Sequence, residues 1–262
     1  MHEILRSLPP GSRVLDLGSK NGSFPARQYA LSVFRLDLEA PHNRSRNFVT
    51  ADAARLPFAA ESFACVITNH SLEHIVNLPD ALTEIRRVLQ PDGSLYVAVP
   101  DASTFSDHIY RWLAHGGGHV NAFVSSEATG AMIANATGLF LIATRPLLSS
   151  FSFANRHNER WSRRIALLGW GNERFLAGLS YGTRVLDRAF KTRWSHYGWA
   201  FYFGTIAEAI PVEIWTNVCV RCGSATPASL IKLHRRALLP NVYRCPACSA
   251  RNLFTDDSAP SA

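Results

Sequence analysis

The chain has 262 residues, 47% of them hydrophobic, and a formal net charge of +7 at pH 7. This length and apolar content suit one large domain with a buried core plus a small appendage, and they exclude a disordered chain. The sequence does not open with a basic segment followed by an apolar one, and no run of about 18 apolar residues occurs. We therefore expect an ordered, cytoplasmic protein without a transmembrane segment.

The positive charge is unevenly placed along the chain. Residues 1–148 carry 12 basic and 13 acidic side chains, whereas residues 149–200 carry nine basic and three acidic ones. Residues 212–254 add six basic side chains against one acidic. Because 24 of the 27 basic residues are arginine, a compositional bias of the source genome explains the surplus as easily as a binding role does.

Short apolar runs alternate with segments of helical period, which predicts a parallel sheet with helices on both faces. The expected strands are Arg13–Gly18, Val33–Leu38, Phe48–Ala51, Phe63–Thr68, Ser94–Val99, Leu139–Thr144 and Trp199–Ile206. The clearest helix starts at Leu78 and is stopped by the turn-forming run Pro91-Asp92-Gly93, and a second helix is expected over Ser125–Thr137. The predicted fold class is therefore α/β, doubly wound, with a mostly parallel, seven-stranded sheet.

The βα pattern is interrupted after residue 148. Residues 149–198 are rich in Arg, Trp, Phe and Gly with only patchy helical periodicity, and we expect a lid, an acceptor site, an interface or a partner-binding surface there. Residues 199–211 would complete the sheet as a late strand, and residues 255–262 would form a disordered tail. The core domain is then residues 1–148.

Three predicted strands lead into an acidic residue, namely Asp16, Asp37 and Asp52. Because the carboxyl ends of neighbouring parallel strands share one edge of a sheet, these carboxylates should line one crevice, where open α/β folds bind ligands. Gly18 and Gly22 belong to a turn that lets the backbone approach a ligand closely. We therefore expect a nucleoside-type cofactor at this edge. The alternative is that each acid merely caps a turn.

Five segments in order resemble the motifs of class I S-adenosylmethionine-dependent methyltransferases of the type 11 kind. These segments are Val14–Gly22, Arg35–Leu38, Asp52–Phe58, Thr68–Ile75 and Arg86–Leu95. The resemblance covers residues 13–101. It implies a Rossmann-like fold, S-adenosylmethionine as the cofactor and methyl transfer as the activity.

The resemblance also implies the cofactor contacts. Asp16 would lie near the ammonium group of the methionine part, for which Gly18 and Gly22 would leave room. Asp37 would accept hydrogen bonds from the ribose hydroxyls, and Asp52 would face the adenine. The other expected contacts are Ser19, Lys20, Leu38, Ala53 and Asn69.

Two features leave alternatives open. A dinucleotide site also uses a glycine turn and an acid about 20 residues on, although the acid before Gly18 and the third-strand Asp52 favour the methyl donor. Lys20 stands where the family has its middle glycine. Its side chain either crowds the cofactor or pairs with the cofactor carboxylate. If it crowds the cofactor, the chain is a binding protein with a decayed pocket.

Methyl transfer depends mainly on positioning, and a general base is needed only if the acceptor keeps its proton. His70, His74 and His119 are the candidates for that base. His70 directly follows the fourth strand, whereas His74 follows Glu73 in a pair that often packs in relatives resembling this chain. His119 lies in a glycine-rich loop, and an ordinary loop histidine is the plain alternative.

The residues after the fourth strand lack the Asn-Pro-Pro-aromatic pattern that accompanies methylation of exocyclic base amines. The sequence thus resembles methyltransferases that act on small-molecule, lipid-linked or saccharide acceptors. The alternative partner is RNA, bound electrostatically by the basic segments. Arg mixed with Trp and Phe in residues 149–200 also predicts peripheral contact with a membrane surface.

Residues 212–254 contain two C-x-x-C pairs, and 22 residues separate the pairs. The ligands would be Cys219, Cys222, Cys245 and Cys248. This spacing is close to that of tetrahedral four-cysteine zinc sites and resembles a zinc ribbon. Four sulfur ligands leave no position for water, so Zn²⁺ would be structural. A pair of disulfides or a redox pair is the alternative.

Overall fold

A computed structural model of the chain divides into two compact units. The first unit comprises Met1–Pro100, His119–Thr144 and Trp199–Val212, and the second comprises Asp101–Gly118, Arg145–Gly198 and Glu213–Ala262. The structure describes residues 1–19, 22–42, 45–113, 119–148, 151–155, 172–205, 216–227, 241–246 and 248–254. Lys20 and the expected tail at 255–262 lie outside the described residues.

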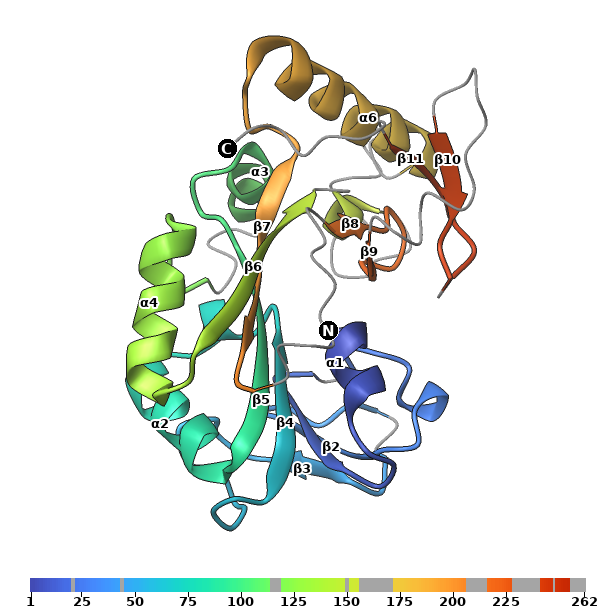
Figure 1. Cartoon of the computed structure of the whole chain (residues 1–262). Coiled ribbons are helices and arrows are strands. Elements are labelled where there is room, and N and C mark those ends of the chain that lie inside the picture. The colour runs from blue at the N-terminus through green and yellow to red at the C-terminus, as the bar shows by residue number, and fades with distance from the viewer. Residues whose placement is uncertain are drawn as a thin grey trace. The chain divides into compact units, whose positions relative to one another are not determined.

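The main sheet has nine strands in the order β3-β2-β1-β4-β5-β7-β6-β8-β9 (Figure 1). All seven predicted strands are present: β1 (Arg13–Leu17), β2 (Ser32–Asp37), β3 (Phe48–Thr50), β4 (Phe63–Asn69), β5 (Leu89–Pro100), β6 (Leu141–Leu148) and β7 (His196–Phe203). Strands β1 to β5 pair in parallel, and the strand order reverses between β1 and β4. The α/β Rossmann-like fold class is therefore confirmed.

Apolar side chains of the strands and of two helices form the core of the first unit. Helix α2 (Leu78–Val88) buries five apolar residues along one face, as its periodicity predicts, and it packs beside α4 (Ser126–Thr137). The helix ends at Val88, and β5 begins at once because Leu89 pairs with Phe63. The run at 91–93 therefore lies within β5 instead of in a separate turn. A register shift between Phe63 and Cys65 accommodates it.

The remaining short helical elements are α1 (His2–Ser7), η1 (Ala26–Gln28), η2 (Leu72–His74), α3 (Phe105–Leu113) and η3 (Ser152–Ala154). Neither α1 nor α3 was expected from the sequence. None of the helices in the described ranges is long and apolar enough to span a bilayer.

Helix α6 (Glu173–Phe190) extends for 18 residues through the segment that the sequence gives only patchy helical periodicity. Its buried face starts with Leu176 and Ala177 and continues with polar residues, namely Ser180, Thr183, Arg184 and Asp187. These polar residues recur at helical spacing, but a search for apolar periodicity does not register them. Leu176 packs with Phe151 and Ala154, and hydrogen bonds hold the polar part of the face.

Four short strands lie in the second unit and form two hairpins. Strand β8 (Thr216–Val218) pairs antiparallel with β9 (Ala225–Pro227), and β10 (Asn241–Arg244) pairs antiparallel with β11 (Arg251–Phe254). Strand β8 also pairs with the end of β6, through Leu147 and Leu148. The cysteine segment is therefore built from β-hairpins.

Asp187 offers a test of the polar packing of α6. Its buried carboxylate accepts hydrogen bonds from the Thr192 hydroxyl at 2.6 Å and from the Trp194 and Ser195 N–H groups, both at 2.7 Å. Asp187→Ala leaves these donors without an acceptor, so we expect the free energy of unfolding to fall by roughly 2–4 kcal/mol. Urea unfolding measures this. The exposed Val185→Ala is the control, and an equal change in both variants would contradict the account.

Candidate functional site

The carboxyl ends of β1, β2 and β3 lie side by side at one edge of the sheet. Asp16 is paired in register with Arg35, and Asp37 is paired with Thr50 at the end of β3. The acidic side chains differ in exposure, since Asp16 is fully buried, Asp37 is half-buried and Asp52 is exposed. The edge therefore presents Asp37 and Asp52 to a ligand and holds Asp16 beneath the turn that follows β1.

That turn depends on glycine at position 18. Gly18 has a φ of +69°, and its N–H donates to the Leu36 carbonyl at 2.7 Å. A Cβ at this position would lie 2.3 Å from the Cβ of Ser71, in the segment after β4. Only glycine permits so close an approach. The turn after β1 and the segment after β4 are thus brought into direct contact.

Asp16 is the most strongly constrained of the acids. Its Oδ2 accepts a hydrogen bond from the Ser23 N–H at 2.8 Å, while the Ser19 hydroxyl donates to its backbone carbonyl at 2.9 Å. Burial raises the pKa of the Asp16 carboxyl, and the hydrogen bonds from Ser23 and Ser19 and the charge of Arg35 oppose this shift. Within the described part of the chain, Oδ1 has no hydrogen-bond partner. A buried acceptor of this kind suits a cationic or hydrogen-bonding ligand.

Arg35 belongs to this site although sequence reasoning did not single it out. Its Nε lies 3.8 Å from Asp16 Oδ2, and its guanidinium lies against Gly22, where an added Cβ would fall 2.4 Å from Nη2. The signal was available, because side chains two apart on a strand share a face. Arg35 and Asp37, the candidate for binding the ribose, are two residues apart on β2 and therefore share a face. The guanidinium provides positive charge beside the glycine turn.

The other described residues expected to contact the cofactor lie at the carboxyl ends of neighbouring strands: Ser19 after β1, Leu38 after β2, Ala53 after β3 and Asn69 at the end of β4. Leu38 is 68% exposed directly after Asp37, which gives the edge an apolar surface beside a carboxylate. Ala53 is buried behind Asp52, and Asn69 ends β4 half-buried. A glycine turn, an acceptor at Asp37 and an exposed leucine fit a nucleoside with an amino-acid tail.

The three candidate histidines lie near one another in the first unit. His70 has a φ of +55°, and its Nδ1 lies 3.8 Å from the Glu73 carboxylate. Burial, reinforced by the nearby His119 and His74 rings, lowers the pKa of His70 to about 4. His70 is therefore neutral near pH 7 and is a weaker proton acceptor than an ordinary histidine. The His74 and His119 rings meet edge to face, with centroids 4.9 Å apart.

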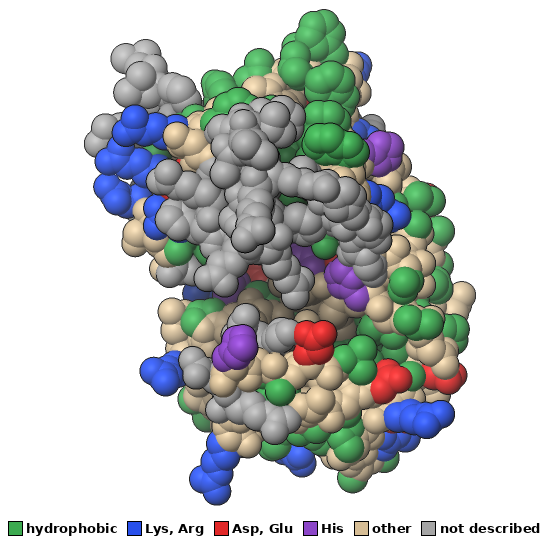
Figure 2. Space-filling view, turned by 180° about the vertical axis from the view of Figure 1, so that it is seen from behind, with side chains coloured by type: hydrophobic (Ala, Val, Ile, Leu, Met, Phe, Trp, Pro, Cys, Tyr) green, Lys and Arg blue, Asp and Glu red, His purple; other side chains and the backbone are tan. Residues whose placement is uncertain are grey.

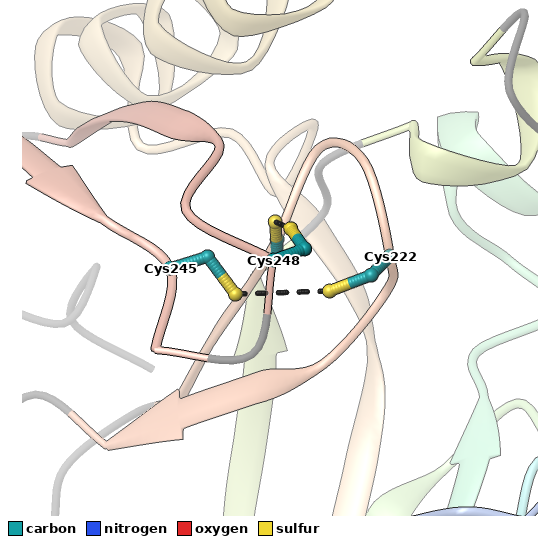
Figure 3. A group of neighbouring side chains, drawn as sticks. Cys222, Cys245 and Cys248 are labelled. Atoms are coloured by element: carbon teal, nitrogen blue, oxygen red, sulfur yellow. Dashed lines mark hydrogen bonds between the residues drawn. The ribbon is translucent and has the colours of Figure 1, made fainter.

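The structure brings all four predicted metal-binding cysteines together. Each C-x-x-C pair forms the turn of one hairpin, between β8 and β9 and between β10 and β11. Cys222 and Cys245 point toward each other with their sulfurs 3.7 Å apart, as Figure 3 shows, and the sulfurs of Cys219 and Cys248 are 3.6 Å apart. Tetrahedral Zn–S bonds of about 2.3 Å separate sulfurs by about 3.8 Å. None of the four cysteines forms a disulfide with a described residue, and a tetrathiolate metal site fits this geometry.

Helix α6 supports the cysteine turns. Glu173 at its start accepts hydrogen bonds from the guanidinium of Arg221, inside the first C-x-x-C pair. Farther along, Arg184 donates to the Leu253 carbonyl at 3.0 Å and to the side chain of Asn217. Burial lowers the pKa of Arg184 to about 10. The described part of residues 149–198 thus packs against the hairpins that carry the cysteines.

Comparison with protein families gives one clear result. The model of a family described as a methyltransferase domain matches residues 1–143. Among curated relatives, a malonyl-[acyl-carrier protein] O-methyltransferase of Methylococcus capsulatus is 31% identical over 135 residues, which cover 46% of this chain and 49% of that protein. A demethylmenaquinone methyltransferase of Renibacterium salmoninarum is 36% identical over 105 residues, covering 37% and 44%. The chain thus spans about half the length of these relatives.

Solved structures share the fold at low sequence identity. A putative methyltransferase from Bacillus halodurans superposes with a TM-score of 0.52 at 19% identity, covering 78% of this chain and 96% of that one. Phosphoethanolamine N-methyltransferase 2 of Haemonchus contortus, solved with phosphomonomethylethanolamine and S-adenosylhomocysteine, gives a TM-score of 0.50 at 17% identity, covering 78% and 50%. At this sequence identity, the superpositions show a shared fold and nothing more.

The contact between Gly18 and Ser71 can be tested by substitution. For Gly18→Ala we expect a loss of about 2–4 kcal/mol in the free energy of unfolding, from the positive φ and from overlap with Ser71. Gly138→Ala is the matched control, because Gly138 has a φ of +65° and no atom within 4 Å of an added Cβ. Adding Ser71→Gly should reduce the cost of Gly18→Ala to that of the control. Equal costs for the two single variants in urea unfolding would refute the contact.

Proposed function

The chain belongs to the methyltransferase domain family, and we propose that it transfers a methyl group from S-adenosylmethionine to a small-molecule, lipid-linked or saccharide acceptor. The observation that carries this proposal is the shared carboxyl edge, where a glycine turn over buried Asp16 adjoins Asp37 at the end of β2. The proposed location of this activity is the cytoplasm.

Each residue at this edge is assigned to one part of the cofactor. Asp37 accepts hydrogen bonds from the ribose hydroxyls, Leu38 contacts the base, and Asp52 lies at the adenine edge. Asp16 attracts the ammonium group of the methionine part, while the guanidinium of Arg35 offers a partner for its carboxylate. When bound, S-adenosylmethionine supplies an electrophilic methyl carbon on a sulfonium centre. The protein then needs mainly to orient the acceptor for in-line attack.

The acceptor class follows from the relatives and from the segment after β4. The relatives named above methylate a malonyl group on acyl-carrier protein and demethylmenaquinone, which supports a small organic or carrier-linked acceptor. His70 and His74 lie beside Ser71, which contacts the glycine turn, and the His119 ring packs against His74. We therefore assign these three histidines to binding that acceptor or moving its proton.

For the cysteine segment we propose a structural Zn²⁺ held by Cys219, Cys222, Cys245 and Cys248. Sulfur separations close to those of a tetrathiolate site support this proposal, as does the matching turn at each pair. At the first turn the Gly223 N–H donates to the Cys219 carbonyl at 3.0 Å, and at the second the Ser249 N–H donates to the Cys245 carbonyl at 2.8 Å. The ion would stabilise two short hairpins that have little apolar core.

An RNA acceptor is the second candidate, because the zinc ribbon and the basic segments would then bind the phosphate backbone. Among the described side chains, Lys and Arg are visible in separate groups on the face in Figure 2. The names of the relatives reported above, which give a malonyl-carrier acceptor and a quinone acceptor, favour the small-acceptor proposal. A filter-binding titration in which affinity falls steeply with salt would favour RNA instead.

The cofactor assignment predicts the effect of Asp37→Asn. The substitution keeps the size of the side chain but removes the charged acceptor for two hydroxyls, so we expect S-adenosylmethionine affinity in calorimetry to fall roughly 10- to 100-fold. Glu39→Gln, which neutralises an exposed acid two residues on, is the control and should bind as the wild type does. No wild-type binding at millimolar cofactor would instead favour a scaffold with a decayed pocket.

The zinc assignment predicts the outcome of Cys222→Ala. Cobalt substituted into the wild type should give a strong thiolate-to-metal charge-transfer band, and the variant, with three thiolates left, should give a weaker band and bind the ion less tightly. Its Tm should also fall by about 5 °C or more, because the more weakly bound ion stabilises the hairpins less. Cys65→Ala, which removes a buried thiol within β4, should keep the band. A band of equal strength in the Cys222 variant would exclude the assignment.

A further inference from the structure

A second group of metal-binding side chains lies in the first unit, apart from the cysteines. One carboxylate oxygen of Glu73 and one ring nitrogen each of His74 and His119 lie within 4.8 Å of one another. Glu73 is 2% exposed, His119 is half-buried and His74 is exposed. The group therefore has a buried carboxyl group on its inner side and opens toward solvent on the side of His74.

Hydrogen bonds tie together the two segments that supply these side chains. The Glu73 carbonyl accepts hydrogen bonds at 2.8 and 3.1 Å from the two backbone N–H groups that follow His119. The Asn121 side-chain amide donates to the Leu72 and Ile75 carbonyls at 2.9 and 2.7 Å. Four hydrogen bonds thus hold His119 beside the helical turn η2. The three side chains are brought together by the fold itself, before any ligand is considered.

Two imidazoles and one carboxylate form the ligand set of catalytic zinc sites, which keep a position open for water or substrate. Bonds of about 2.1 Å would draw the three ligand atoms to about 3.4 Å from one another. The cysteine site differs from this group, because its four sulfurs leave no open position.

We propose that Glu73, His74 and His119 bind a divalent cation, Zn²⁺ by preference, and that this cation holds the acceptor through a hydroxyl oxygen. The location supports the proposal, because Ser71, only two residues before Glu73, touches Gly18 of the cofactor turn. An ion here lies beside the expected position of the methyl donor. The acceptor class is thereby narrowed to compounds with a phenol, an enol or a diol.

The cation would act by making the acceptor hydroxyl more acidic. The hydroxyl releases its proton to solvent, and an oxygen lone pair forms the bond to the methyl carbon. The bond from that carbon to sulfur breaks, its electron pair stays on sulfur, and S-adenosylhomocysteine is released. The reaction step rests on the proposed function, whereas binding of the ion does not.

The test counts ions in the full-length protein. Wild type, His74→Ala, His119→Ala and the double variant are loaded with Zn²⁺, dialysed and analysed for metal. We expect the double variant to hold one ion fewer per chain than the wild type, and each single variant to bind that ion about 100-fold more weakly or worse. His42→Ala, an exposed histidine elsewhere in the first unit, should retain the wild-type count. Equal counts in the wild type and the double variant would overturn the proposal.

Cobalt spectroscopy and calorimetry separate the parts of the proposal. The double variant should lack one Co²⁺ ion that the wild type binds, and the spectrum of that ion, taken as the difference between the two proteins, should contain no thiolate charge-transfer band. Catechol, which chelates metals through oxygen, should change this spectrum in the wild type. A bound ion whose spectrum ignores catechol would overturn the acceptor assignment. Calorimetry on the same samples measures S-adenosylmethionine binding. Absence of cofactor binding would contradict the proposed function, whereas absence of the ion would contradict only the metal site.

Discussion

The close approach of Gly18 to Ser71 is the constraint on which the candidate site depends. It places the turn after β1 directly against the segment after β4, with no side chain between them. The same turn is held to β2 by the hydrogen bond from Gly18 to the Leu36 carbonyl. One backbone position therefore joins the edge expected to bind the cofactor to the segment that carries His70, Glu73 and His74. Methyl transfer requires such adjacency, because the donor and the acceptor must be aligned.

The two units rely on different kinds of interaction. The first has a continuous apolar core between its strands and helices, and Asp16 and Glu73 are buried among its described residues. The second buries Arg184, Asp187, Asn217 and Asn252 among hydrogen-bonded partners. Satisfied polar networks specify a unique arrangement, but they tolerate the loss of a member poorly. A metal-linked pair of hairpins suits such a unit, because its small apolar clusters contribute little hydrophobic stabilisation.

Sequence reasoning predicted the parts of the structure that follow from apolar periodicity and from short local motifs. The seven strands, α2, α4 and the convergence of the four cysteines belong to this class. It missed α6, because most of the buried face of that helix is polar. It missed Arg35, because motif reasoning considers the acid at the strand end and not the residue two before it. The cluster of Glu73, His74 and His119 was also out of reach. It depends on hydrogen bonds from Asn121 to residues 46 and 49 positions earlier.

The central claim, that the edge formed by β1 and β2 binds the methyl donor, is tested most directly by a crystal structure of the protein with S-adenosylhomocysteine. The account predicts the ribose hydroxyls within hydrogen-bond distance of the Asp37 carboxylate, and the amino-acid tail over the Gly18 turn beside Arg35. Density for the ligand at any other edge of the sheet, or the guanidinium of Arg35 filling the space of the tail, would contradict it.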